Sequence, residues 1–370
     1  MTKPIKILFT IPNFDTAGSG KVVYDLVKGV DRNLFEPHIA CHHDRGAFFN
    51  EVKGLGVPIH IVEFSTTYRP FSTFPLRLLK IIRFFKREQF DLIHSWHWSS
   101  DISEPLAAKW AGIPFIYTKK AMGWGNRAWR WRSQLSTQII TINRDMEKGI
   151  LAPYKDKLRY MPLGVDLQRF QPLARTRSTP LGHRYQEDDF VIVSIANLAP
   201  VKGIEVLLEA VRMLEDTQIQ VLIVGDHHNA YGRALKETYS STQVHFIPKQ
   251  LDIRPYLAVA DLFVIPTKDE GRKEGLPIAP MEAMACGKIV VGSDISGIKD
   301  ILNKYPQCLF EPNNIENLKK ILEKIKLMEH DEKIQLGKRM SEFIKENFSV
   351  NQFIKSHESL YVSLYNCYHN

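Results

Sequence analysis

Cysteine is scarce in this 370-residue chain, which contains only Cys41, Cys286, Cys308 and Cys367. The four are widely separated, with no C-x-x-C pair and no histidine at ligand spacing, which argues against a zinc site and against a disulfide framework. The sequence also has no Asp-x-Asp pair that could hold a divalent cation. We therefore expect no metal ion and no cofactor, and a reducing compartment such as the cytoplasm.

Long apolar runs are absent as well. No stretch approaches the roughly 18–20 apolar residues that a membrane span needs. The apolar residues 7–11 are cut off by Pro12 and Asn13, unlike a signal peptide. A composition with 44% hydrophobic and 24% charged residues is typical of a soluble globular protein, and the length suits about two domains.

Acidic residues are outnumbered, with 41 Asp and Glu against 49 Lys and Arg, for a net charge of +8. Such an excess favours anionic partners, among them nucleic acid, phosphorylated substrates and an anionic membrane face. Composition does not choose among these partners.

Short runs rich in Ile, Val and Phe alternate with helical patterns along the chain. This alternation predicts parallel sheets covered on both faces. We therefore expect an α/β fold of two Rossmann-like, doubly wound domains facing a central cleft, with ligands beyond the carboxyl ends of the strands. The expected strands cover residues 5–11, 38–42, 58–62, 91–94, 114–118, 138–142 and 158–161, then 190–195, 220–224, 244–247, 261–265, 288–292 and 308–310.

Domain boundaries follow from a stretch without strong periodicity. Residues 164–189 contain Pro172, Pro180 and several charges, so we expect them to link the domains. The predicted domains are residues 1–170 and residues 171–345. Residues 346–370 are predicted to form a helix that packs back on the first domain.

Two glutamates, Glu274 and Glu282, lie eight positions apart in the segment 274–287. The first falls in a Gly/Pro loop after an expected strand, and the second in the first turns of the helix that this loop opens. Such a loop presents backbone N–H groups at a helix N-terminus, where an anion is favoured. Glu282 is then placed to accept hydrogen bonds from ribose hydroxyls, and Glu274 to face a sugar ring.

This segment resembles the glutamate–seven residues–glutamate loop of the family 4 retaining glycosyltransferases, which have the two-Rossmann GT-B architecture. The resemblance implies a nucleotide diphosphate-sugar donor, UDP- or GDP-linked, with Glu282 on its ribose. It also implies that Glu274 contacts the transferred sugar, as a catalytic residue. The backbone that would hold sugar and phosphate is that of Gly275, Leu276, Pro277 and Ile278.

A second segment, residues 194–203, is similar to the strand–loop–Lys-Gly element of that family. The resemblance implies that Lys202 binds the donor diphosphate and acts in catalysis. Cleavage of a sugar–phosphate bond builds negative charge on the phosphate oxygens, and a fixed ammonium group lowers that barrier. Many family members have arginine where this chain has Asn197. We include Asn197 in the donor site and expect Arg272 or Lys273 to supply the cation.

A third segment, residues 15–21, resembles the amino-terminal glycine loop of the family, which approaches the diphosphate, and Gly18 is the position carried over. It is not a Walker A loop, because Lys21 is followed by Val22 and Asp15 stands at the expected first glycine.

The acceptor side departs from the family, which usually has a histidine after its fifth strand where this chain has Lys120. His94 and His97, at the end of the fourth expected strand, are candidate acceptor contacts, although a histidine at a strand end is more often structural. Retaining members of the family need no dedicated protein base, because the leaving phosphate helps to take the proton.

All six tryptophans lie between residues 96 and 131, and the basic stretch 119–132 contains no acidic residue. We interpret this stretch as an acceptor platform that includes Trp124. A membrane interface and an ordinary mixture of core and surface are the alternatives. Residues 76–87 are predicted to form a helix with a basic face, which either binds anionic lipid or simply covers the sheet.

The sequence thus predicts an enzyme, a glycosyltransferase that acts on a glycan or lipid-linked acceptor in cell-surface polysaccharide or lipopolysaccharide biosynthesis. It would work in the cytoplasm, at the inner face of the membrane. One alternative is a nucleotide-sugar epimerase of the same architecture, which would need no acceptor. The other is a non-enzymatic protein that binds anionic glycans or nucleic acid. No recognition helix or RNP motif supports nucleic-acid binding, so we expect none.

Overall fold

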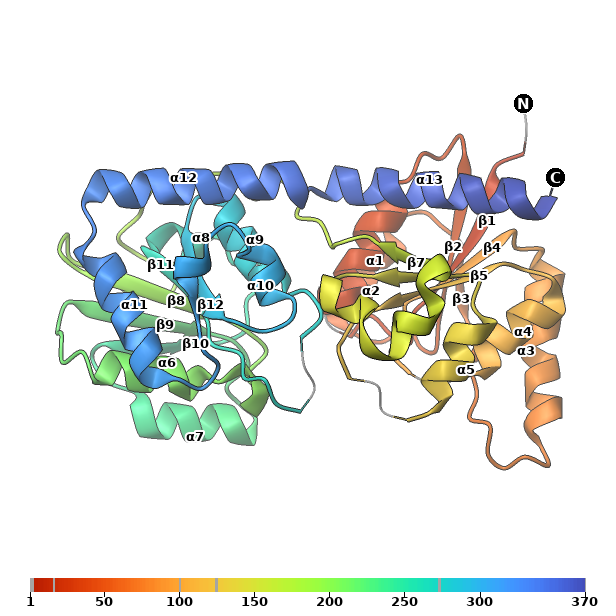
Figure 1. Cartoon of the computed structure of the whole chain (residues 1–370), viewed down its shortest axis with the longest axis horizontal. Helices are drawn as coiled ribbons and strands as arrows, with labels where there is room; N and C mark the ends of the chain where they lie inside the picture. Colours follow the sequence, from red (N-terminus) through yellow and green to blue (C-terminus); the bar gives the residue numbers. More distant parts are fainter. Residues whose placement is uncertain (1–2, 16, 100, 124–125, 272–273, 370) are drawn as a thin grey trace. The chain divides into compact units, whose positions relative to one another are not determined.

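The computed structural model describes residues 3–15, 17–99, 101–123, 126–271 and 274–369, and the chain divides into two compact units (Figure 1). Unit 1 comprises Met1–Leu163 and Val350–Asn370, and unit 2 comprises Gly164–Ser349. Residues 164–170, expected in the first domain, thus belong to the second unit. The terminal helix α13 (Val350–His369) belongs to unit 1.

Unit 1 is built on a seven-stranded parallel sheet in the order β3-β2-β1-β4-β5-β6-β7. In the central strand β1, Ile7, Leu8 and Phe9 are all fully buried, as expected for a sheet covered on both faces. The strands are β1 (Ile5–Thr10), β2 (Phe35–Cys41), β3 (Ile59–Ile61), β4 (Leu92–Ser95), β5 (Phe115–Lys119), β6 (Gln138–Thr141) and β7 (Leu158–Tyr160).

The helices of unit 1 cover this sheet with apolar faces. A Cβ on Gly29 of α1 would collide with Ile354, so α13 packs closely on α1. Helix α3 buries Leu78, Ile81 and Phe85 among its core residues, so the helix expected over residues 76–87 does cover the sheet. The bounds are α1 (Ala17–Gly29), α2 (Ala47–Lys53), α3 (Phe74–Glu88), α4 (Ser103–Ala111), α5 (Ala128–Leu135), η1 (Arg144–Glu147) and η2 (Gly149–Lys157).

Unit 2 has a six-stranded parallel sheet in the order β10-β9-β8-β11-β12-β13. Its strands are β8 (Phe190–Ile195), β9 (Ile219–Val224), β10 (Val244–Ile247), β11 (Leu262–Ile265), β12 (Ile289–Ser293) and β13 (Leu309–Phe310). Its helices are η3 (Pro200–Lys202), α6 (Ile204–Arg212), α7 (Ala230–Tyr239), α8 (Arg254–Val259), α9 (Ile278–Ala285), α10 (Ile298–Ile301), η4 (Pro306–Cys308), α11 (Ile315–Leu327) and α12 (His330–Asn347).

The expected linker, residues 164–189, packs on unit 2. The Leu173 N–H donates to the Cys286 carbonyl at 3.3 Å, and the Thr176 N–H donates to the Ala258 carbonyl at 3.2 Å. These bonds make the segment part of the second unit, which corrects its assignment as a connection between domains.

In each sheet the first three strands are added in one direction from the first strand, and the later strands are added on its other side. β1 lies between β2 and β4, and β8 lies between β9 and β11. Such a reversal opens a crevice at the carboxyl ends of the two diverging strands. The seven and six parallel strands confirm the fold class predicted from the sequence. None of the described helices combines the length and the hydropathy that crossing a membrane requires.

Candidate active site

Lys202 lies in the loop that leaves β8, at the end of the 3₁₀ turn η3. Gly203 follows with φ +60°, a left-handed conformation that favours glycine, and a Cβ there would collide with the Pro266 carbonyl oxygen. The Lys268 N–H also donates to the Val201 carbonyl at 2.8 Å. The loops after β8 and β11 therefore touch backbone to backbone, at the point where the chain order of the sheet reverses.

Glu274 lies in the loop after β11, and its carboxylate forms an ion pair with the Nζ atom of Lys202. The two side chains are only 20% and 19% exposed. The structure thus brings together the two residues that the sequence singled out as catalytic. They occupy the crevice between β8 and β11.

The backbone after Glu274 is held in place by a second close approach. Gly297 has φ +84°, and a Cβ there would collide with the Gly275 carbonyl oxygen. Leu276 is buried, and Pro277 stands directly before the first residue of α9, Ile278. The amides at the start of α9 are therefore fixed beside Glu274, where an anionic group is favoured by the helix dipole.

Glu282 and Asn197 are expected donor residues that also lie in unit 2. Glu282 is half-buried on α9, one turn after Ile278. Asn197 is exposed in the loop after β8. This loop packs directly against the residue after β9, because a Cβ on Gly225 would collide with the carbonyl oxygen of Ala196 in the loop. Arg272 and Lys273, the expected substitute cations, lie outside the described residues.

Lys268 is a further cation at this edge that the sequence reading missed. It follows β11, contacts the Gly203 position, and pairs with Glu205 at the start of α6. Burial alone would raise the pKa of the Glu205 carboxyl, but hydrogen bonds from Lys268 and Tyr231 hold it below its usual value. A lysine three residues after an apolar strand could have been noticed in the sequence, since it lies at the carboxyl edge.

In unit 1, the crevice between β1 and β4 corresponds to the one between β8 and β11 in unit 2. A buried ion pair lies beneath it. The Glu104 carboxylate accepts hydrogen bonds from Thr10 at the end of β1, from Ser95 at the end of β4 (2.8 Å), and from Arg132 of α5 (3.0 Å). Both charged side chains are fully buried. Burial raises the pKa of Glu104, while the Arg132 guanidinium and the two hydroxyl groups oppose that rise. The pair fixes the ends of the two diverging strands.

His97 lies above this ion pair, with Nδ1 4.0 Å from the Glu104 carboxylate. Burial and the positive charge of Arg132 lower the pKa of His97 to about 2, so its imidazole is neutral. The ring of His42, which follows β2, lies 6.1 Å from that of His97. Lys120 donates to the Trp96 carbonyl, and its Nζ lies 5.1 Å from the Trp98 ring centroid. Sequence reasoning proposed His97 and Lys120 as acceptor residues but missed their neighbours His42 and Trp98.

His94 does not share this position. Its ring is fully buried, with Nδ1 2.7 Å from the Tyr361 hydroxyl and Nε2 2.8 Å from the Thr118 hydroxyl. It also stacks on His357 of α13 at 5.5 Å between ring centroids. The expectation that His94 contacts an acceptor is therefore wrong, because the ring is inaccessible and both nitrogens are used inside unit 1.

Gly18 and Trp124 are the two remaining candidate site residues. Gly18 lies in the first turn of α1 with non-helical angles (φ −33°, ψ −106°), and among the described residues nothing lies within 4 Å of where its Cβ would be. Gly18 is exposed in the segment that follows β1, and its contact to a diphosphate stays a prediction. Trp124 lies outside the described residues.

Comparison with known proteins agrees with this arrangement. Residues 181–347 match the family Glycosyl transferases group 1, and residues 16–169 match Glycosyltransferase Family 4. The chain is 27% identical over 318 residues to the N,N'-diacetylbacillosaminyl-diphospho-undecaprenol alpha-1,3-N-acetylgalactosaminyltransferase of Campylobacter jejuni, covering 78% of this chain and 81% of the relative.

Two solved structures share the fold. A glycosyltransferase from Rickettsia africae superposes with a TM-score of 0.84 at 19% identity, over 98% of this chain and 99% of that one. The Anabaena protein HepE, in complex with UDP and glucose, superposes with a TM-score of 0.78 at 17% identity, over 97% and 100%. The two family matches together span most of both units, so the chain belongs to the family 4, group 1 glycosyltransferases and is a sugar-transferring enzyme of the GT-B fold.

Proposed function

We propose that this enzyme transfers a sugar from a UDP-sugar, with GDP as the alternative nucleotide, to a lipid-linked glycan in the synthesis of a cell-surface polysaccharide or lipopolysaccharide. The observation that carries the proposal is the ion pair between Lys202 and Glu274 beside the first turn of α9. The name of the Campylobacter relative specifies a diphospho-undecaprenol acceptor, and HepE was solved with UDP and glucose.

The donor is held by unit 2 in this proposal. Its diphosphate lies against Lys202 and the amides at the start of α9, with Asn197 beside it. Its ribose hydroxyls donate to Glu282, and the sugar contacts Glu274 and the backbone of residues 275–278. Glu274 also keeps the Lys202 ammonium group in position before the donor binds, because the two side chains are already paired.

The reaction proceeds with retention and without a metal ion. The bond between the anomeric carbon and the diphosphate oxygen breaks, and the acceptor hydroxyl oxygen bonds to the same face of that carbon. The hydroxyl proton passes to the departing phosphate. Lys202 neutralises the charge that grows on this phosphate. Electrostatic stabilisation of this kind, by a preorganised group, is usually the largest single term in the lowering of a reaction barrier.

The acceptor candidates lie in unit 1. A neutral His97 can accept a hydrogen bond from an acceptor hydroxyl. Lys120 adds a positive charge at the ends of β4 and β5, which suits the diphosphate of a lipid-linked glycan. His42 completes this cluster through its ring contact with His97.

Access to a lipid-linked acceptor calls for peripheral membrane association at the cytoplasmic face. In unit 1, Phe71 is 68% exposed and Leu76 is 66% exposed, beside the basic side of α3. Lys80, Arg83 and Lys86 are exposed on that helix. Exposed apolar groups flanked by cations fit an anionic bilayer surface, where each cation near the surface contributes about 1 kcal/mol.

The test is a transfer assay with the full chain, labelled UDP- and GDP-sugars, and a short-chain polyprenyl diphosphate glycan. We expect transfer with release of nucleoside diphosphate, retention of the anomeric configuration by NMR, and full activity in EDTA. A donor should also raise the melting temperature by mass action. Conversion of the sugar nucleotide without an acceptor would identify an epimerase instead. The absence of any thermal shift with all donors would overturn the proposed site.

A further inference from the structure

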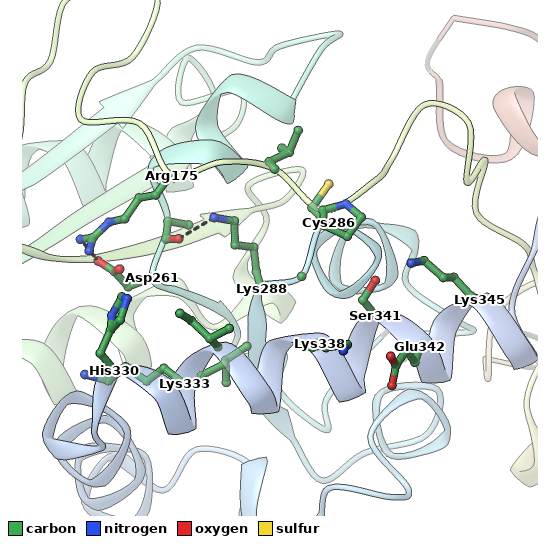
Figure 2. A pocket seen from close by; sticks show the side chains of 16 residues that line it. Arg175, Asp261, Cys286, Lys288, His330, Lys333, Lys338, Ser341, Glu342 and Lys345 are labelled. Atoms are coloured by element: carbon green, nitrogen blue, oxygen red, sulfur yellow. Dashed lines mark hydrogen bonds and ion pairs between the residues drawn. The ribbon is translucent and has the colours of Figure 1, made fainter.

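A groove of about 580 Å³ opens on unit 2, at the amino ends of β11 and β12. The Lys202–Glu274 pair lies at the carboxyl ends of the sheet, so this groove is separate from the donor site. Its walls are residues 172–175, the start of β12 with the end of α9, and one face of α12 (Figure 2). A cavity of this size suits a small organic ligand.

The walls of the groove are fixed to one another by backbone contacts. The Leu173 N–H donates to the Cys286 carbonyl at 3.3 Å, and the Ser341 hydroxyl donates to the Ala285 carbonyl at 3.0 Å. A Cβ on Gly337 would collide with the Gly287 carbonyl oxygen, so α12 rests directly on the turn after α9. The groove is therefore a preformed feature of unit 2.

The charge of the lining is predominantly positive. It contains Arg175, Lys288, Lys333, Lys338 and Lys345 against the carboxylates of Asp261 and Glu342. Arg175 and Asp261 neutralise each other at 2.6 Å, and Lys333 donates to the Lys326 carbonyl. The net excess therefore comes from Lys288, Lys333, Lys338 and Lys345, against the single remaining carboxylate of Glu342.

Lys288 is unusual because it is only 8% exposed. Its Nζ donates to the Ala260 carbonyl at 3.0 Å and lies 3.5 Å from the Ala258 carbonyl. An ammonium group has three N–H donors, so these two carbonyls leave one for a ligand. Figure 2 shows Lys288 at the Arg175–Asp261 end of the groove, and Lys338 and Lys345 along α12.

Between these cations the groove is apolar. Leu173, Cys286 and Ile289 line it, together with Ile334, which is 51% exposed although it is a large aliphatic side chain. His330, Lys333, Ile334, Lys338, Ser341 and Lys345 follow one another at intervals of one to four residues, which places them on one face of α12. Ile334, Lys338, Glu342 and Lys345 are exposed along the groove, whereas Ser341 is buried against the Ala285 carbonyl.

We propose that this groove is a second ligand site, which binds a small phosphate ester with a hydrocarbon body. The phosphate contacts Lys338 and Lys345 at the rim formed by α12. The hydrocarbon covers Ile334 and Leu173. Inorganic phosphate lacks the apolar part and a neutral alkyl glycoside lacks the charge, so each should bind at least tenfold more weakly.

The experiment is titration calorimetry of the full chain with octyl phosphate below its micellar concentration, without any sugar nucleotide. Because the donor is left out, the result does not depend on the proposed function. We expect saturable binding that Lys338→Glu with Lys345→Glu weakens at least tenfold. The matched control, Lys320→Glu with Lys324→Glu on α11, makes the same charge change outside the groove and should leave binding unchanged.

Several results would overturn the site. One is the absence of saturable binding, and another is equal weakening in both double variants. Binding of octyl glucoside as tightly as octyl phosphate would remove the role of the lysines. Finally, sedimentation with phosphatidic acid vesicles that depends on Lys338 and Lys345, without binding of free octyl phosphate, would make this face a membrane contact rather than a ligand site.

Discussion

The Nζ atom of Lys202 and a carboxylate oxygen of Glu274 form an ion pair between the loops that follow β8 and β11. We expect Lys202→Ala to lower kcat by about 10²–10³-fold, the usual cost of removing one preorganised group at a developing charge. The melting temperature should change little, since the pair is partly exposed. Steady-state kinetics and a thermal melt check both points. Near-normal kcat would place Lys202 outside the reaction.

Glu282 should act on donor affinity rather than on the chemical step. Loss of hydrogen bonds to a charged group costs about 1.5–3 kcal/mol, so Glu282→Ala should weaken donor binding roughly 10–100-fold. Calorimetric titration with UDP and with the UDP-sugar measures this directly. Glu316→Ala, on the exposed side of α11, is the control. An unchanged dissociation constant would reject the ribose contact.

The buried pair of Glu104 and Arg132 should matter for stability. Glu104→Gln leaves a guanidinium without its counter-charge in a fully buried site, which costs about 3–5 kcal/mol. Urea denaturation should show this loss, and the double variant Glu104→Met with Arg132→Met should be less destabilised than either single change. Glu147→Gln, in the partly exposed pair with Arg144, should cost at most about 1 kcal/mol. Equal losses for the two pairs would contradict this reading.

Stability should fall as the pH falls below neutrality. Burial lowers the pKa of His357 in α13 from 6.5 to about 4, so between these values the unfolded chain binds a proton that the folded chain does not. His357 therefore contributes stability that is present above pH 6.5, and about 2 kcal/mol of it is lost by pH 5. Urea denaturation at pH 7.5, 6 and 5 should give a steeper decline for the native chain than for His357→Gln. Parallel declines would argue against the buried neutral ring.

Membrane association should depend on the exposed apolar groups beside α3. Phe71→Ser with Leu76→Ser should reduce partition onto phosphatidylglycerol vesicles at least tenfold, since burial of such side chains contributes about 1.5–3 kcal/mol each. Leu251→Ser with Leu181→Ser, which changes two exposed residues of unit 2, is the control. Sedimentation with vesicles at two salt concentrations separates the apolar contribution to binding from the charged contribution, because salt screens the charges. Equal partition of all three proteins would show that α3 only covers the sheet.

The strands could be predicted because parallel sheets bury both faces, so that a strand such as β11 appears as an unbroken apolar run. The Lys202 and Glu274 loops were found because their motifs resemble those of the family 4 glycosyltransferases. What holds them together could not be predicted, because the contacts of Gly203 with Pro266 and of Gly297 with Gly275 join segments far apart in the sequence.

His94 shows why the acceptor side was harder to predict. Its place at the end of β4 was correct, but sequence alone does not show which face of the sheet a side chain enters. The return of the terminal helix was predicted, but not that its Tyr361 and His357 enclose this ring. Glu104 was missed for the same reason, because its partners come from β1, β4 and α5. The segment 164–189 was misassigned because weak periodicity is also compatible with a chain fixed to a domain by backbone hydrogen bonds.

Because α13 supplies part of unit 1, this unit is complete only when residues 350–369 have been made. A ribosome adds the whole of unit 2 between Leu163 and Val350. At about 5–20 residues per second this interval lasts on the order of 10–40 s. Throughout it, the sites that Ile354 and Tyr361 later fill stay uncovered on the nascent sheet. The second unit can therefore finish folding first, and unit 1 is completed only after α13 has left the exit tunnel.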